Sequence, residues 1–311
     1  MPDDKIPAGK IMIQNRSLRE VLNLHAAWLA GSGGQRANLR GGSFADADLR
    51  KADLRRALLT GISFLEADLT EADFSGATIE KCDFRNALLS KTNFSETDLS
   101  DVNFHRSLFS DANLSEARMQ RVIFREANMR DSRFYDVRMS FCDCTSTNLQ
   151  SAYFNHAKIS ECSFTEANME KCNLLRARFH SCRFVAAKLI NANLGSIRAV
   201  DCDFHGAELN SAKLTLAHLS QNSFCGATMA SCDFRESNLS AADFSGAILL
   251  NSTFREANIM ATDFRGSVLE GARGFTGRQL SQSLTSFNTV LPSGTRGPFI
   301  KGKNSEIPVS R

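Results

Sequence analysis

The residues best suited to chemistry in this chain of 311 residues are its cysteines, four of which recur at intervals of twenty positions. These four are Cys142, Cys162, Cys182 and Cys202. Such a column suggests redox or metal chemistry, but thiols stacked in parallel present no tetrahedral arrangement for zinc, and no Cys-x-x-Cys pair occurs. A buried thiol without a nearby positive charge also stays protonated and unreactive. We therefore interpret the column as core packing.

The other residues with catalytic potential form no recognisable constellation. The nine cysteines do not indicate a disulfide framework, because their number is odd and the chain is long. The six histidines are spread along the sequence, and none is placed beside a Ser or Cys nucleophile. No phosphate-binding loop is present, and the 19 glycines are scattered. The sequence therefore predicts a protein that is not an enzyme and that binds neither a metal nor a cofactor.

Positive charges recur in the middle of the chain with the same spacing of twenty residues. They are Arg118, Arg138, Lys158, Arg178 and Arg198, which we call the basic column, and His218 continues the spacing. If residues twenty apart are stacked neighbours, these cations lie about 4.8 Å apart, which is the spacing of paired strands, and they repel one another. Two interpretations stay open: a solvated face that shields the backbone, or a docking surface for an acidic protein or a nucleic acid.

Charge along the chain changes sign twice, although 37 Lys and Arg residues nearly balance 34 Asp and Glu residues. Residues 37–117 carry a net charge of −5, residues 118–198 carry +6, and residues 199–272 carry −5. Only Tyr135, Phe141 and Tyr153 offer aromatic rings near the basic column. Because single-stranded nucleic acids bind by stacking on such rings, this scarcity favours a protein partner over a nucleic acid.

A second candidate surface is apolar. Ile248, Leu250, Met260 and Val268 occupy outward positions near the C-terminal end of the patterned region. Exposed apolar clusters often mark interfaces. The cluster either mediates homodimerisation through the C-terminal ends or lies beneath a C-terminal helix, and the sequence does not choose between them.

All these residues belong to a repeat of five residues that continues without interruption from residue 37 to residue 272. The centre of each repeat is a position whose number ends in 4 or 9. Of the 47 centres from Leu39 to Leu269, 45 are Leu, Phe, Met or Ile, the exceptions being Cys144 and Ala199. A small residue stands two positions before each centre. Two inward residues in every five fit a four-sided coil in which each side is one repeat.

A coil of four repeats makes residues twenty apart stacked neighbours, and the sequence supports this period. The column of centres from Phe44 to Phe264 is Phe at eleven of its twelve levels. The thiol column occupies one column of small positions, whereas the other three such columns are nearly all Ala, Ser or Thr. A period of ten would not separate these columns. Asn222 is the one inward amide and requires backbone or water partners.

The repeated unit, as in Ala47-Asp48-Leu49 and Ala127-Asn128-Met129, resembles the Ala-Asp/Asn-Leu-x-x signature of pentapeptide-repeat proteins. The resemblance covers 236 residues. It implies an all-β solenoid, a right-handed quadrilateral parallel β-helix of about twelve coils of 20 residues, capped by a short helix at each end. Some members of that family bind DNA gyrase and protect it from inhibitors.

The repeat also sets the domain organisation. We expect an N-terminal strand and helix cap (1–36), the pentapeptide-repeat β-helix (37–272), a C-terminal helical cap (273–290) and a disordered basic tail (291–311). Ser17 with Glu20, and Thr276 with Gln279, have the spacing of capping boxes at the starts of the two helices. Residues 1–10 do not resemble a secretory signal, and no apolar run is long enough to span a membrane, so we expect a cytoplasmic protein.

The sequence thus favours a non-catalytic interaction scaffold that binds an unidentified protein through its outward residues. Three alternatives stay open. One is a DNA-mimic-like modulator or protector of DNA gyrase or topoisomerase, although the basic middle zone and the near-neutral total depart from that pattern. The others are a secreted or phage-associated effector or adaptor, and, less favoured, a nucleic-acid-binding protein.

Overall fold

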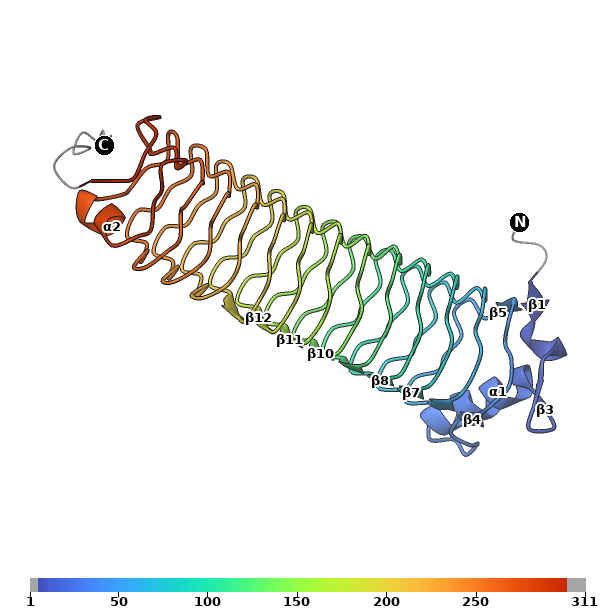
Figure 1. Cartoon of the computed structure of the whole chain (residues 1–311). Helices are drawn as coiled ribbons and strands as arrows, with labels where there is room; N and C mark the ends of the chain where they lie inside the picture. Colours follow the sequence, from blue (N-terminus) through green and yellow to red (C-terminus); the bar gives the residue numbers. More distant parts are fainter. Residues whose placement is uncertain (1–4, 301–311) are drawn as a thin grey trace. The chain divides into compact units, whose positions relative to one another are not determined.

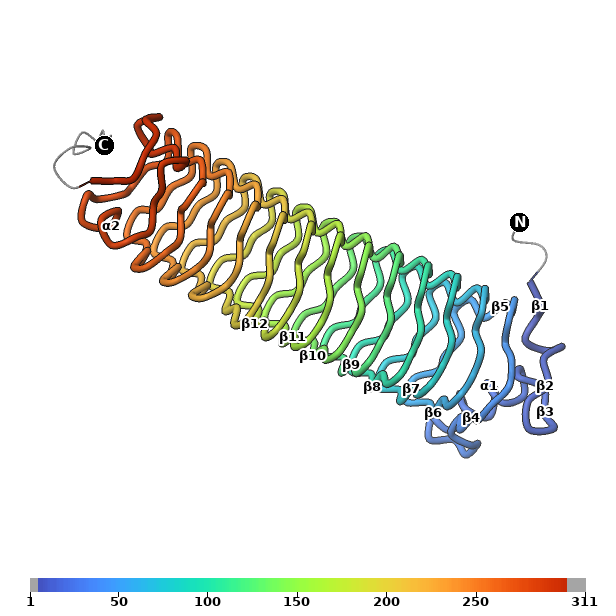
Figure 2. The backbone as a smooth tube through the Cα atoms, viewed as in Figure 1, coloured from blue at the N-terminus to red at the C-terminus, as the bar shows by residue number. Residues whose placement is uncertain are grey.

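The computed structural model describes residues 5–300. The chain forms two compact units, Met1–Tyr153 and Phe154–Arg311. Within each unit the backbone winds in successive turns, and short strands lie at the same place in consecutive turns (Figures 1 and 2). Each unit is therefore a parallel β-solenoid with twenty residues in a turn. The total of twelve coils expected for the whole chain stays a prediction.

The first unit begins with a cap built from short elements. These are β1 (Ile6–Pro7), η2 (Ala8–Lys10), β2 (Met12–Ile13), β3 (Arg16–Ser17) and α1 (Leu18–Leu29). The side chain of Ser17 accepts a hydrogen bond from the N–H of Glu20 at 3.2 Å, which satisfies one free amide at the start of α1. The expected N-terminal strand and helix are present, and the Ser17 signal marks the helix start correctly.

The solenoid of the first unit contains seven strands of two or three residues. They are β4 (Asn38–Arg40), β5 (Ala47–Asp48), β6 (Leu58–Thr60), β7 (Thr78–Glu80), β8 (Asp98–Ser100), β9 (Arg118–Gln120) and β10 (Arg138–Ser140). Strands β4 and β6 to β10 form successive parallel pairs in which each residue lies opposite the residue twenty positions away. On the other sides of the coil, isolated parallel bridges repeat the same offset. The predicted twenty-residue period is confirmed.

The second unit continues this arrangement within its own residues. Strands β11 (Lys158–Ser160), β12 (Arg178–His180) and β13 (Arg198–Val200) pair in parallel, and later turns are joined by single bridges such as His218 with Asn238. The helix α2 (Gly277–Ser281) follows the last repeat.

Every repeat bends at a corner, and the chemistry of the corner explains the repeat signature. The residue two positions after each centre has a positive φ, for example 58° at Glu66 and 61° at Asp111. The Asp or Asn before the centre turns its side chain back to the backbone. The Oδ1 atom of Asn93, for instance, accepts a hydrogen bond from the N–H of Ser95 at 3.1 Å. Asp and Asn suit this position because their short side chains bond to the backbone two residues on.

The core consists of the inward positions, as predicted. Every centre from Leu39 to Leu269 is buried. Rings of the Phe column stack in both units, with centroids 4.5 Å apart for Phe64 and Phe84 and 4.6 Å apart for Phe184 and Phe204. The buried Asn222 accepts a hydrogen bond from the N–H of Cys202 at 2.7 Å and donates to the carbonyl oxygens of Ala199 and Ser220. Backbone partners therefore satisfy this inward amide.

The expected helical span of 273–290 is too long. Helix α2 has five residues and begins at a capping box formed by Thr276 and Gln279. After it, the chain resumes solenoid pairing. The carbonyl oxygen of Leu284 accepts from the N–H of Phe264, and that of Val290 accepts from Leu269, each at 2.8 Å. The helix stops early because the last full turn presents backbone N–H groups that need partners, and an extended segment supplies them.

The expected disorder of residues 291–311 is wrong for its first part. Leu291 is buried, and its N–H donates to the carbonyl oxygen of Thr295 at 2.8 Å. The N–H of Gly297 donates to the carbonyl oxygen of Thr289 at 3.1 Å. The buried residues Leu291 and Pro292 and these bonds hold the loop against the last turn. Residues 301–311 lie outside the described residues.

Candidate protein-binding surface

Two members of the basic column lie in the first unit. Arg118 and Arg138 are register partners in β9 and β10, and both side chains are exposed. Arg118 approaches one carboxylate, the Oδ1 atom of Asp98, at 3.4 Å. Asp98 belongs to β8 and is the register partner of Arg118 on the other side. The Arg118 charge is therefore partly offset within its own sheet.

Three members of the basic column lie in the second unit, and we call them the cation run. Lys158, Arg178 and Arg198 are successive register partners in β11, β12 and β13, and all three are exposed. Among the described residues, no carboxylate is within ion-pair distance of any of the three. Like charges directly opposite one another in a sheet destabilise it. The cation run therefore places uncompensated charge on the surface.

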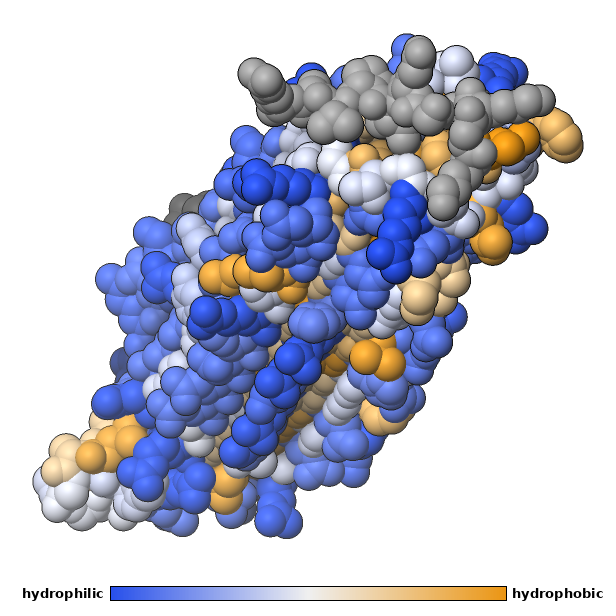
Figure 3. Space-filling view, turned by 90° about the vertical axis from the view of Figure 1, so that its left-hand side faces the viewer, coloured by the Kyte–Doolittle hydropathy of each residue, from blue (hydrophilic) through white to orange (hydrophobic). Residues whose placement is uncertain are grey.

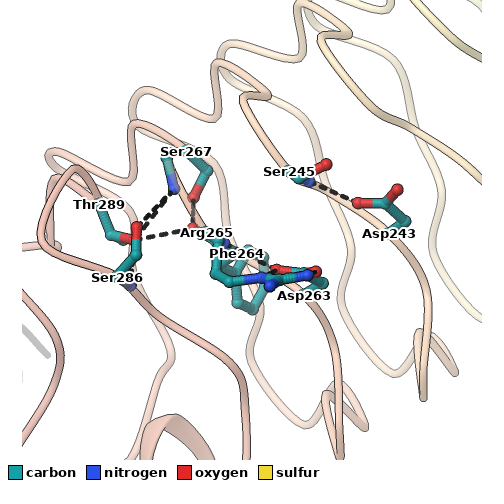
Figure 4. Close-up of polar contacts among 9 residues, drawn as sticks. Asp243, Ser245, Asp263, Phe264, Arg265, Ser267, Ser286 and Thr289 are labelled. Carbon is teal, nitrogen blue, oxygen red and sulfur yellow. Dashed lines mark hydrogen bonds and ion pairs between the residues drawn. The ribbon is translucent and has the colours of Figure 1, made fainter.

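Five arginines elsewhere among the described residues are neutralised by an Asp two residues earlier. In Figure 4, the guanidinium of Arg265 lies against the carboxylate of Asp263, with Nη2 and Oδ2 2.5 Å apart. The hydrogen bond from Arg265 lowers the pKa of the Asp263 carboxyl. The same arrangement occurs at Asp48 with Arg50, Asp53 with Arg55, Asp83 with Arg85, and Asp233 with Arg235. The cation run differs because the residues two positions before its members are His156, Arg176 and Ser196 rather than acids.

The apolar candidate surface is only partly exposed. Ile248 and Val268 are bridge partners, as the sequence predicts, but Val268 also bridges Val290 in the extended segment after α2. Of the four residues, Met260 is the most exposed, at 56%. Helix α2 contacts another part of the last turn, where the Nε2 atom of Gln279 donates to the carbonyl oxygen of Ala257. An extended segment thus borders this surface, and homodimerisation stays a prediction.

The thiol column is buried, as predicted from packing. Cys142, Cys162, Cys182 and Cys202 are each at most 3% exposed. The neighbouring thiol of Cys182 and burial together raise the pKa of Cys202. A thiol in this state is a poor nucleophile. Within residues 5–300, no cluster of three or more His, Cys, Asp or Glu side chains is arranged to hold a metal ion.

His25 lies in α1, and the sequence predicts no role for it. The imidazole is fully buried. Its Nδ1 atom accepts a hydrogen bond from the N–H of Ala37 at 3.0 Å, and Nε2 therefore donates to the carbonyl oxygen of Arg55 at 2.9 Å. The ring also stacks on Trp28, with centroids 5.6 Å apart. His25 thus fastens α1 to two backbone groups at the open end of the solenoid.

Two bulky apolar side chains among the described residues occupy corner positions that suit glycine or short polar residues. Phe141 has φ 55° and Leu216 has φ 58°, and each is 51% exposed. Exposed side chains on hydrophobic residues are visible in Figure 3 as separate orange patches among hydrophilic ones. The sequence could have revealed both positions, because each holds a bulky apolar residue two positions after a repeat centre.

None of the helices in residues 5–300 has the length and hydropathy of a membrane span.

Several solved structures are similar to this chain. HetL, a pentapeptide-repeat protein involved in heterocyst differentiation regulation in the cyanobacterium Nostoc sp. strain PCC 7120, is 22% identical over 87% of this chain and 96% of its own, with a TM-score of 0.26. QnrB1, a plasmid-mediated fluoroquinolone resistance protein, is 17% identical over 54% of this chain and 93% of its own, with a TM-score of 0.28. Rfr23 from the cyanobacterium Cyanothece 51142 is 17% identical over 50% and 90%, with a TM-score of 0.20.

Because these TM-scores are low, no functional residue of those proteins is assigned to this chain. Among curated proteins, none matches the sequence. The family model for pentapeptide repeats matches in eight copies, and its matches extend over residues 23–195 and 202–273. These ranges contain Lys158 and Arg178 of the cation run and the solenoid strands β4 to β12, whereas Arg198 and β13 lie in the short gap between them. The chain belongs to the pentapeptide-repeat family.

Proposed function

We propose that this protein is a non-catalytic interaction scaffold that binds an acidic protein partner through the cation run. The solenoid supplies the rigid support, and the outward side chains of successive turns supply the recognition surface. In this proposal the fold is a right-handed quadrilateral β-helix of about twelve coils, and the protein acts in the cytoplasm.

The observation that carries the proposal is the lack of carboxylate partners for Lys158, Arg178 and Arg198 among the described residues. Each of these cations has a like charge as its register partner. Their mutual repulsion weakens the sheet, and an acidic partner would reverse this effect, since opposite charges across an interface are attractive and set the orientation of binding.

Affinity purification from the native host tests this proposal. The bait is the wild-type chain, and the test variant is Arg178→Glu/Arg198→Glu. The control variant is Lys188→Glu/Lys213→Glu, which changes net charge equally at two exposed lysines on other sides of the second unit. We expect an acidic protein to be recovered with the wild-type and control baits and lost with the test variant. Recovery of the same acidic protein with all three baits would show that the cation run is not its binding surface.

A second candidate function is modulation or protection of DNA gyrase or topoisomerase. The net charge of −5 on residues 37–117 and again on residues 199–272 favours it, because a DNA mimic must present negative charge. A supercoiling assay with purified gyrase, with and without the protein, distinguishes the two candidates. A change in supercoiling activity at micromolar protein supports this second function, and unchanged activity excludes it.

A further inference from the structure

A cavity of about 190 Å³ lies where the N-terminal cap meets the first turn of the solenoid. Its apolar lining comes from Ile13 in β2, Val21 and Leu24 in α1, and Leu39 in β4. Its polar lining comes from Gln14, Arg16, Gln35, Arg36 and Asn38. Among residues 5–300, no carboxylate lines the cavity. The described residues therefore give it an apolar floor and a rim whose formal charges are positive.

Strand β4 forms one wall of this cavity and has a free edge. In a parallel ladder, alternate residues bond to opposite neighbours. The carbonyl oxygen of Ala37 accepts from Leu58, and the N–H of Gly41 donates to the carbonyl oxygen of Thr60, so the odd-numbered residues bond towards β6. The even-numbered residues Asn38 and Arg40 consequently direct their backbone groups away from β6.

The cap bonds to the first turn at other places but leaves most of this edge unpaired. Strand β1 pairs with β5, and His25 bonds to the carbonyl oxygen of Arg55. On β4, the carbonyl oxygen of Asn38 receives one long hydrogen bond, at 3.4 Å from Nε2 of Gln14. Within residues 5–300, the backbone N–H and C=O of Arg40 have no protein partner on that side. An unpaired strand edge of this kind is a template for another strand.

The cations of the rim are concentrated at the amino end of β4. Arg36 lies two residues before β4; its Nε donates to the carbonyl oxygen of Arg56, and its guanidinium lies 5.6 Å from the ring centroid of Trp28. The Nη1 atom of Arg16 donates a hydrogen bond to Oε1 of Gln35 at 3.2 Å, and its Nε atom lies 3.7 Å from Oε1 of Glu20. A carboxylate at this end of the strand would complete the charge balance, because among the described residues Glu20 is the one carboxylate within ion-pair distance of either arginine.

We propose that β4 and the cavity bind the C-terminal end of an extended peptide. The peptide adds to the free edge of β4, places its last apolar side chain in the cavity, and presents its terminal carboxylate to Arg16 and Arg36. Because these arginines lie at the amino end of β4, the peptide runs antiparallel to that strand. Peptides recognised by strand addition gain affinity from the backbone and specificity from a side-chain pocket. The volume suffices for such a side chain, since cavities of about 150 Å³ hold benzene.

This site is separate from the cation run, and its ligand is an extended peptide rather than an acidic protein surface. Its test uses fluorescein-labelled hexapeptides of alternating Thr and Val that end in Leu, Phe or Val, each made as the free acid and as the C-terminal amide. Fluorescence polarisation with the full chain measures Kd. We expect binding of at least one free acid, and an affinity at least about tenfold lower for its amide. Absence of binding by every free acid, or equal binding of acid and amide, would overturn the proposal.

A matched pair of variants tests the strand edge. Arg40→Ala keeps the backbone N–H that faces the cavity side, whereas Arg40→Pro removes it without breaking the pairing of β4 with β6. We expect Arg40→Pro to bind the free acid at least about tenfold more weakly than Arg40→Ala, with thermal unfolding of both variants monitored by circular dichroism. Equal affinities in two folded variants contradict addition to the strand. If Arg40→Pro does not fold, Val21→Phe, which fills the cavity from α1, replaces it, and undiminished binding by that variant contradicts the proposal.

Discussion

At the residue scale, Phe141 combines an unfavourable backbone conformation with an exposed ring. Its φ of 55° lies in the left-handed region, where a side chain with a Cβ atom is strained, and Asn tolerates that region best among residues with side chains. We predict that Phe141→Asn stabilises the protein by about 0.5–1.5 kcal/mol, measured by urea denaturation. Gln120→Asn, at an exposed position of ordinary φ in β9, should bring no gain. A loss of stability in Phe141→Asn would mean that the ring contributes packing that outweighs the strain.

His25 makes the stability of the N-terminal cap depend on pH. Burial lowers the pKa of its imidazole below the ordinary 6.5, although the carboxylate of Asp53 opposes this shift, and the guanidinium groups of Arg36 and Arg55 reinforce it. The folded state therefore prefers the neutral ring, and the stabilisation is complete above pH 6.5. It decreases as the pH falls below 6.5, because the unfolded chain then takes up a proton that the folded chain resists.

We therefore expect the free energy of unfolding to fall between pH 6.5 and pH 5 more steeply in the wild-type chain than in His25→Gln. Denaturant titrations at several pH values measure this difference. His25→Gln also loses one of the two ring hydrogen bonds to the backbone, so its stability at pH 7.5 should be lower by roughly 1–3 kcal/mol. Parallel pH dependence in the two proteins would show that another group carries the effect.

At the element scale, the C-terminal segment after α2 completes the last turn through a small polar network. Thr289 is fully buried. Its hydroxyl donates to the carbonyl oxygen of Phe264 at 3.0 Å and accepts from the N–H groups of Gly266 and Ser286 (Figure 4). Thr289→Val preserves shape but removes these bonds, and we expect a loss of roughly 1–3 kcal/mol in thermal or chemical unfolding. Ser293→Val, at an exposed position nearby, should be nearly neutral.

The elements show which parts of the fold follow from sequence. Inward positions were predictable because each five-residue repeat must bury its small residue and its centre, and this pattern recurs in 47 repeats. The end of α2 was not predictable. The apolar residues Leu280, Leu284 and Phe287 have helical spacing, but the unpaired backbone of the last turn outweighs that spacing and draws Leu284 into a bridge with Asp263.

The candidate sites also contain some features that the sequence predicts and others that it does not. The alignment of Lys158, Arg178 and Arg198 followed from the twenty-residue period alone, because register fixes which outward side chains are neighbours. Their lack of carboxylate partners required the positions of all surrounding side chains. The cavity beside β4 required the path of the cap, which has no repeat and therefore no internal register from which to predict it.

At the scale of the whole molecule, the period of twenty residues defines the unit that can be removed. We predict that deleting residues 65–84 leaves a chain that folds cooperatively, because the remaining turns restack column on column. Deleting residues 75–84 instead places the Phe column over a different column at the junction. The ten-residue deletion should therefore show the lower melting temperature in circular dichroism, although it removes fewer residues. The opposite order would contradict a twenty-residue stacking unit.

Titration with poly-L-glutamate measures directly whether the cation run binds an acidic polypeptide. The proteins compared are the wild-type chain, Arg178→Glu/Arg198→Glu, and the equally charged control Lys188→Glu/Lys213→Glu. We expect Kd to rise at least about tenfold for the first variant and to stay within about twofold of wild type for the control, with similar melting temperatures for all three. Equal weakening by both variants would show that net charge, rather than the cation run, determines binding.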